Sequence, residues 1–169
     1  YKEKLGKNFS KVKMVSFFVT AENVNQLLLD NGINGEIDLL SIDIDGNDYW
    51  VWKAIEAINP RVVVIEYNAS LSWDKSITIK YDPNFNVSSI YHGASLSAFK
   101  KLANAKGYIL VGCDFHGIDA FFVRKDLAQG KLIELSPEEA YYPHFQRSKD
   151  VGSTEKQFER IKNLDFDNV

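Results

Sequence analysis

The sequence has little of what marks a secreted, membrane-spanning or nucleic-acid-binding protein. Its one cysteine, Cys113, has no partner for an intrachain disulfide and lies in an apolar stretch, so we expect a core thiol in a reducing compartment. No apolar run is long enough to span a bilayer, and the polar start "YKEKLGKNFSKVK" lacks the apolar block of a signal peptide. A net charge of −3 provides no basic field for nucleic acid. We therefore predict a cytoplasmic protein that engages neither a membrane nor a nucleic acid.

Internal repeats and low-complexity tracts are also missing. The 169 residues, 45% of them hydrophobic, suit one globular domain with a core of its own. Because the first residue is Tyr rather than Met, we expect a fragment, a processed chain or only the ordered part of one.

Hydrophobic periodicity predicts alternating strands and helices. The pattern predicts a strand over 12–20, a helix over 21–32, a strand over 36–44, a helix over 48–58, a strand over 61–68 covered on both faces, a helix over 94–107, and an antiparallel pair over 108–113 and 120–124. This order is typical of an α/β domain whose sheet is mostly parallel and ends in an antiparallel hairpin. Beyond it, residues 128–169 form a tail with one short helix, in which Thr154 and Gln157 are spaced as a capping box. We expect this tail to pack on the core or on a partner.

The long connection 69–93 is polar and holds scattered aromatic residues. A loop of this length in a compact domain is more often functional or mobile than idle. Within it, Trp73 and Tyr81 are candidates for stacking on a sugar, and His92 is a candidate base. By contrast, we expect Tyr49, Trp50 and Trp52, at partly helical spacing, to pack in the core.

Acidic and amide side chains follow two successive predicted strands. Alternation along a strand would place Asp43 and Asp45 on one face, and Glu66 and Asn68 in a row on the next strand. The ligand crevice of an open α/β sheet lies outside the carboxyl ends of its strands. Because an unpaired buried carboxylate is costly, we expect these groups to meet a ligand, a metal or hydrogen-bond donors there. The structural alternative is that Asp48 only caps the next helix and Asp45 only orders the Gly46–Asn47 turn.

Other enzymes also use an Asp-x-Asp pair at a strand end. In phosphatases of the haloacid dehalogenase type it supplies a nucleophile, an acid and a magnesium ligand, and in glycosyltransferases it holds a metal on a diphosphate. Here Asn47 stands after Gly46 where the phosphatase motif continues with Thr, and no later Asp-Asp pair follows a strand. The nucleotide-binding half of a glycosyltransferase is not visible either. Both readings stay open as further alternatives.

Four segments together resemble the FkbM-like branch of the S-adenosylmethionine-dependent methyltransferases. They are "IDLLSIDIDGNDYWVWKAI", "NPRVVVIEYN", "GASLSAFKKLANAKGYILVGC" and "GIDAFFVRKDL". The resemblance implies a Rossmann-like sheet within residues 1–127 and methyl transfer to a hydroxyl oxygen, often of a sugar or small metabolite. The Gly-rich cofactor turn of such enzymes and the acid that holds the ribose are not in this sequence. The match therefore corresponds to a partial domain without its first strand-helix-strand unit.

The resemblance also implies roles for individual residues. Asp43 and Asp45 would lie beside the transferred methyl group, and Glu66 and Asn68 would line the acceptor side. The cofactor's adenine would lie near the segment formed by Thr20, Ala21, Glu22 and Asn23.

For the chemistry, we expect Asp43 or Asp45 to take the acceptor's proton, directly or through a divalent metal such as Mg²⁺. Asp43, Asp45 and Glu66 are the expected metal ligands, since carboxylate oxygens suit Mg²⁺ or Ca²⁺. The alternative from another class is a non-catalytic half-domain or assembly module. Its uncovered sheet edge would then bind a partner chain or a second copy.

Overall fold

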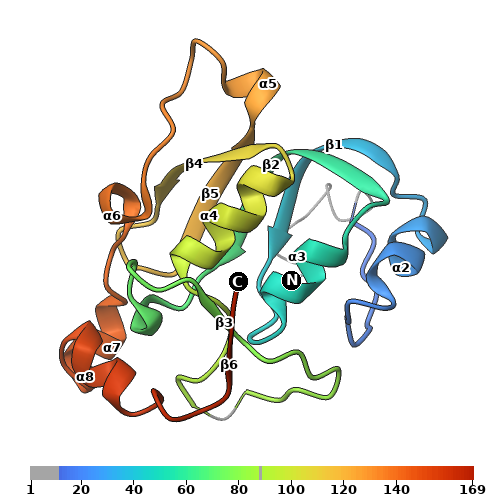
Figure 1. The fold of residues 1–169 in the computed structure, drawn as a ribbon. Coiled ribbons are helices and arrows are strands. Elements are labelled where there is room, and N and C mark those ends of the chain that lie inside the picture. The colour runs from blue at the N-terminus through green and yellow to red at the C-terminus, as the bar shows by residue number, and fades with distance from the viewer. Residues whose placement is uncertain (1–11, 88) are drawn as a thin grey trace.

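The computed structural model describes residues 12–87 and 89–169, and its centre is a four-stranded mixed sheet (Figure 1). The strands lie in the order β1-β2-β5-β4, with bounds β1 Gly35–Ile42, β2 Ile58–Glu66, β4 Tyr108–Cys113 and β5 Asp119–Arg124. β1 and β2 are parallel, whereas β5 is antiparallel to both of its neighbours, β2 and β4. The chain is thus an α/β protein, and the predicted antiparallel hairpin is confirmed.

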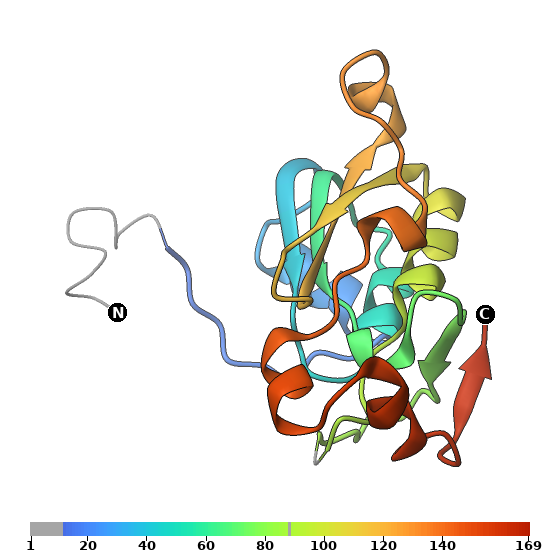
Figure 2. The same ribbon diagram turned by 90° about the vertical axis from the view of Figure 1, so that its left-hand side faces the viewer.

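Helices α3 (Asp48–Ala54) and α4 (Leu96–Ala105) cover one face of the sheet (Figure 2). Their apolar sides meet in an aromatic cluster on β5: the ring centroid of Trp52 lies 5.1 Å from that of Phe122 and 6.2 Å from that of Phe99. Trp52 is 1% exposed and both phenylalanines are fully buried. Trp52 of α3 therefore packs in the core, as its helical spacing predicts.

The opposite face of the sheet is more open than the sequence predicts. Along β2, Val63 and Ile65 are fully buried under the helices, but Val62 and Val64, which point the other way, are only half-buried. The expectation of a strand covered on both faces is therefore wrong. Glu66 continues the row of Val62 and Val64, so the acidic end of β2 lies on this more open side.

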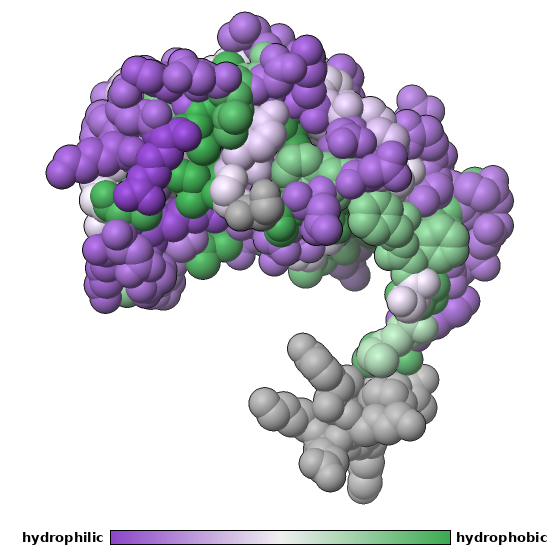
Figure 3. Space-filling view, turned by 90° about the horizontal axis from the view of Figure 1, so that it is seen from below, coloured by the Kyte–Doolittle hydropathy of each residue, from purple (hydrophilic) through white to green (hydrophobic). Residues whose placement is uncertain are grey.

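The predicted strand over 12–20 is not formed by the described residues. Residues 12–20 have no sheet partner there, and most of their apolar side chains are exposed, with Met14 at 69% and Phe17 at 62%. Figure 3 shows hydrophobic side chains on the arm that projects from the body of the protein. Strand propensity alone does not make a strand, because the extended chain becomes stable only through a hydrogen-bonded neighbour. Helix α2 (Val24–Asp30) follows, as predicted.

The long loop and the C-terminal tail are joined by a second, two-stranded sheet. Within the loop lie the 3₁₀ turn η2 (Ala69–Leu71) and β3 (Ile77–Ile79), and β3 pairs antiparallel with β6 (Phe166–Asn168) from the tail. The Ser76 hydroxyl donates to the Val169 carbonyl at 2.6 Å beside this pair. Helix α5 (Lys125–Ala128) leads into the tail. The tail carries three short helices where one was expected: α6 (Pro137–Ala140), α7 (Phe145–Asp150) and α8 (Thr154–Glu159).

The predicted capping box of α8 is wrong. Ser153 is the N-cap, and Gln157 is drawn inward instead, where its Oε1 accepts a 2.7 Å hydrogen bond from the Ser70 hydroxyl. A capping box does form in α6, between Ser136 and Glu139. No helix in the described ranges has the length and apolar character needed to cross a bilayer.

Candidate functional site

Asp48 braces the turn that joins β1 to α3. Its Oδ1 accepts the backbone N–H of Ile44 and its Oδ2 accepts that of Gly46, both at 2.9 Å, and the residue is 1% exposed. The N-cap position of α3 belongs to Asn47, without a side-chain cap bond, so the expectation that Asp48 is the cap is wrong. The buried carboxylate of Asp48 therefore stabilises the turn by accepting two backbone N–H groups.

This turn changes how Asp43 and Asp45 are presented. β1 ends at Ile42, and Asp45 has a φ of +53°, a left-handed conformation that Asp tolerates better than most residues. Simple alternation predicts that the two aspartates share a strand face. They do not, because both lie beyond the end of the strand. Asp48, rather than Asp45, orders the turn.

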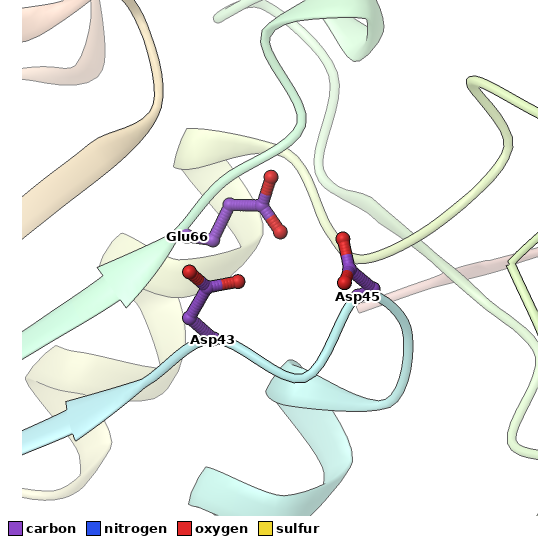
Figure 4. A group of neighbouring side chains, drawn as sticks. All are labelled: Asp43, Asp45 and Glu66. Atoms are coloured by element: carbon purple, nitrogen blue, oxygen red, sulfur yellow. The ribbon is translucent and has the colours of Figure 1, made fainter. Parts of the chain in front are cut away.

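Three carboxylates nevertheless converge at the carboxyl edge of the parallel pair. Asp43, Asp45 and Glu66 each place one oxygen within 4.8 Å of the other two (Figure 4). The register explains part of this, because Ile42 of β1 lies opposite Ile65 of β2, so the next residue of each strand emerges side by side. Asp43 and Asp45 are exposed, whereas Glu66 is only 9% exposed.

Glu66 carries the largest electrostatic penalty among these carboxyls. Burial raises its pKa to about 8, and the charges of Asp48, Asp43 and Asp45 add to the rise, while Arg147 opposes it. Burial also raises the pKa of Asp43, with Asp45 as the second cause. Without a cation, the group therefore holds a proton on Glu66 at neutral pH.

His92 lies buried beside Glu66, with 2% of its surface exposed. Its Nδ1 is 3.9 Å from Oε2 of Glu66, and its Nε2 is 2.7 Å from Nη2 of Arg147. A guanidinium only donates, so Nε2 accepts and the imidazole proton is on Nδ1. Burial, then Arg147 and His144, lower the pKa of His92 to about 4. The ring is thus neutral, and its basic nitrogen is already engaged.

Asn68 uses all of its hydrogen-bonding groups within the protein. Its Nδ2 donates to the carbonyls of Ile90 and His92 at 2.8 and 2.9 Å, and its Oδ1 accepts from Ser70 N–H and from Arg147 Nη1. These four bonds exhaust the amide. Asn68 therefore holds the His92 loop and Arg147 in place, and its oxygen is not free for a ligand.

Arg147 is the site residue that the sequence did not reveal. It lies in α7 of the tail, 79 positions beyond Asn68, and reaches the end of β2 because the tail folds back over the loop. No local pattern distinguishes Arg147 from a surface arginine. The only available hint was the aromatic character of the preceding "YYPHF" segment, which indicates packing against the domain.

Residues 20–23 form the turn that precedes α2, and Asn23 is the N-cap of that helix. Thr20 N–H donates to Asn23 Oδ1 at 2.8 Å, and Asn23 N–H donates to Thr20 Oγ1 at 3.3 Å. Ala21 N–H donates to the Tyr81 hydroxyl, which in turn donates to Glu22. These contacts tie the segment to the long loop.

A pocket of about 260 Å³ lies next to Asp45, on the side of this segment. Aromatic rings of Phe17, Phe18 and Phe85 line it, together with Asn47, whose buried Oδ1 has no hydrogen-bond partner in the described structure. Phe85 covers Gly46 so closely that a Cβ there would lie 2.4 Å from its Cδ1. Glycine is required at this position to let the ring close the pocket.

Comparisons with known proteins add no assignment. No protein-family model, no curated protein and no solved structure matches this chain. The site must therefore be interpreted from its own geometry.

Proposed function

We propose that this site transfers a methyl group from S-adenosylmethionine to a hydroxyl oxygen of a sugar or small metabolite, in a Rossmann-like fold. The observation that carries the proposal is the convergence of Asp43, Asp45 and Glu66 at the carboxyl edge of the parallel strands β1 and β2. That edge is where open α/β sheets bind their ligands. The resemblance of the same segments to FkbM-like methyltransferases supports the choice of reaction.

The pocket beside Asp45 has the chemistry to accept part of this cofactor. Its volume of about 260 Å³ is close to the lower end of the range of about 300–1,000 Å³ for small-molecule sites, which suits one ring system such as adenine. Phe17, Phe18 and Phe85 offer faces for stacking. Asn47 also lines the pocket, and its buried Oδ1 has no hydrogen-bond partner in the described ranges.

The chain's own carboxylates would then prepare the acceptor. S-adenosylmethionine, when bound, supplies an electrophilic methyl group on sulfur. Asp43 would accept the hydrogen bond of the acceptor hydroxyl and take its proton, while the methyl group exchanges its bond to sulfur for a bond to that oxygen and the cofactor leaves as a neutral thioether. Because burial and Asp45 raise the pKa of Asp43, it is a stronger base than an ordinary aspartate. Holding the hydroxyl in line contributes further, since orientation alone can supply several kcal/mol.

Calorimetric titration with S-adenosylmethionine, followed by a methyl-transfer assay over a panel of sugar alcohols, tests this function. We expect saturable binding, and we expect Phe85→Ala to weaken it at least several-fold by removing one stacking face. Asp43→Asn should lower turnover at least about 100-fold, the contribution typical of a positioned base, with cofactor affinity changed less than twofold.

Asp38→Asn is the matched control, because Asp38 is an exposed aspartate of the neighbouring strand β1 whose carboxylate pairs with Arg61 at the surface. It should leave both binding and turnover unchanged. Absence of any cofactor binding would exclude the proposal. Hydrolysis of phosphate esters that depends on Asp43 would instead support the phosphatase alternative.

A second candidate function, an assembly module, is supported by a different observation. β1 is the edge strand of its sheet, Leu39 on it is 56% exposed, and the apolar side chains of Val12–Phe18 are exposed nearby in the chain. An uncovered edge of this kind favours pairing with another chain. In that case the double change Met14→Lys and Leu39→Lys should abolish self-association or partner binding in light scattering, and the carboxylate variants should not.

A further inference from the structure

We propose that Asp43, Asp45 and Glu66 bind one divalent cation of the oxygen-preferring class, such as Ca²⁺, Mn²⁺ or Mg²⁺. The proposal concerns binding and does not require the methyl-transfer reaction, although it uses the same carboxylates.

The spacing of the carboxylates fits such an ion. Opposite ligand oxygens lie roughly 4.2 Å apart around Mg²⁺ and roughly 5 Å apart around Ca²⁺, given metal–oxygen distances of about 2.1 and 2.5 Å. The three oxygens already lie within 4.8 Å of one another. Three oxygens cannot all be opposite one another, and neighbouring oxygens lie roughly 3–3.5 Å apart around such ions, so the exposed side chains of Asp43 and Asp45 would rotate inward to meet the ion.

Unpartnered polar atoms behind the cluster give an independent reason to expect a ligand. Oε2 of Glu66 and Nδ1 of His92 are buried, and neither has a hydrogen-bond partner in the described ranges. Glu66 is 9% exposed and His92 2%, so solvent does not compensate for the missing bonds. An ionised carboxylate buried without a partner costs several kcal/mol, so Glu66 needs either a proton or a counter-charge. A cation in front of Glu66 supplies that charge.

The residues behind Glu66 are arranged as support for a metal ligand. Arg147 donates to Nε2 of His92, which leaves the Nδ1–H directed at Glu66 from 3.9 Å. A shift of about 1 Å brings that pair to hydrogen-bonding distance. Asn68 holds Arg147 in place, because its Oδ1 accepts a hydrogen bond from Nη1 of Arg147 at 3.1 Å. Metal-ligating carboxylates typically have such hydrogen-bonded neighbours, which orient them toward the ion.

The nearest protein cation does not occupy the position of the ion. Nη2 and Nη1 of Arg147 bind His92 and Asn68 and not one of the three carboxylates. Carboxylate oxygens of Asp43, Asp45 and Glu66 line the space between these three side chains (Figure 4). The charges of Glu66 and Asp45 act on Arg147, although its terminal nitrogens bind His92 and Asn68.

Titration with Mn²⁺, followed by electron paramagnetic resonance, tests the site on chelator-treated protein. We expect one saturable site, competed by Ca²⁺ and Mg²⁺, whose relative potency identifies the preferred ion. Asp45→Asn and Glu66→Gln should each weaken Mn²⁺ binding at least about tenfold. His92→Gln and Arg147→Met, which leave all three carboxylates in place, should weaken it about tenfold, as loss of supporting residues does in metal sites.

Asp38→Asn serves again as the control and should bind Mn²⁺ as the unaltered protein does. Glu66→Gln is expected to fold at least as stably as the parent, so its loss of binding cannot be attributed to unfolding. The proposal is overturned if no saturable Mn²⁺ site is found, or if Asp45→Asn and Glu66→Gln leave the affinity unchanged. The titration contains neither S-adenosylmethionine nor an acceptor, so failure of the cation site and failure of the proposed methyl transfer are separate results.

Discussion

Replacing Asp48 with alanine should lower the free energy of unfolding by about 3 kcal/mol, one of the two largest effects that we expect from a single change. The substitution removes both acceptors of the Ile44 and Gly46 N–H groups and leaves these donors without a partner. Each hydrogen bond to a charged group contributes about 1.5–3 kcal/mol. Relief of the cost of burying the carboxyl, whose pKa is raised by burial, offsets part of the loss.

Urea denaturation at neutral pH measures this effect. Asp48→Asn should lose about half as much, because its remaining oxygen can serve one of the two donors while its amide nitrogen faces the other. Asp38→Asn, at an exposed position of β1, should stay within about 0.5 kcal/mol of the parent. An Asp48→Ala protein as stable as that control would contradict the assignment of Asp48 as the brace of the turn.

The same change should also disturb the carboxylate group. The turn held by Asp48 carries Asp45 in its left-handed conformation, so its loosening moves one of the three converging oxygens. We therefore expect Asp48→Ala to weaken Mn²⁺ binding although Asp48 is not among the proposed ligands.

Replacing Glu66 with glutamine should stabilise the protein at high pH by about 2–3 kcal/mol in the presence of a chelator. The folded-state pKa of Glu66 is raised from an ordinary value of 4.5 to about 8, chiefly by burial. Between these values the folded state binds more protons than the unfolded state, so stability is fully present below about 4.5 and is lost as the pH rises through 8. The sign is opposite to that of a salt-bridged carboxylate.

The size of the effect follows from the same shift. At about 1.4 kcal/mol per pH unit, the full shift corresponds to roughly 5 kcal/mol, and we expect about half because water can reach an ionised Glu66 as the loop relaxes. Glutamine has nearly the same shape without the charge.

A series of urea denaturations from pH 5 to pH 9 makes the measurement. The parent protein should lose stability across this range, and Glu66→Gln should be nearly flat. Asp43→Asn should reduce the slope in part, since the charge of Asp43 contributes to the raised pKa of Glu66. A parent protein that gains stability toward pH 9 would mean that Arg147 keeps Glu66 charged, and the electrostatic account of the site would be wrong.

Local chemistry in the sequence determined most of the framework and part of the site. Apolar runs and helical stripes predicted α2, β1, α3, β2, α4 and the β4–β5 hairpin, because periodicity and backbone preference act over a few residues. The predicted end of the second helix at residue 58 is wrong: α3 ends at Ala54, and Asn59 and Pro60 lie inside β2. The same local reasoning placed Asp43, Asp45 and Glu66 at strand ends. Parallel pairing of adjacent strands then made their convergence predictable.

Contacts between distant segments decided the rest. The extended segment Val12–Thr20 has strand-like residues, but the described structure provides no neighbour for it, and propensity cannot replace a hydrogen-bonded partner. Conversely, β3 has only three residues and is a strand because β6, almost ninety positions later, pairs with it. Gln157 does not form the predicted capping box, because its side chain accepts a hydrogen bond from the buried hydroxyl of Ser70, which is distant in the sequence.

The role of each polar residue at the site likewise depends on tertiary contacts. The sequence by itself determined that oxygen-bearing side chains would gather at the carboxyl edge of β1 and β2. Only the tertiary structure, by folding α7 back onto that edge, determined that Asn68 and His92 are engaged by Arg147, while Asp43, Asp45 and Glu66 remain directed at one another. The physical reason is that hydrogen bonds and burial depend on which atoms are close in space. The separation of two residues along the chain does not predict whether their atoms are close.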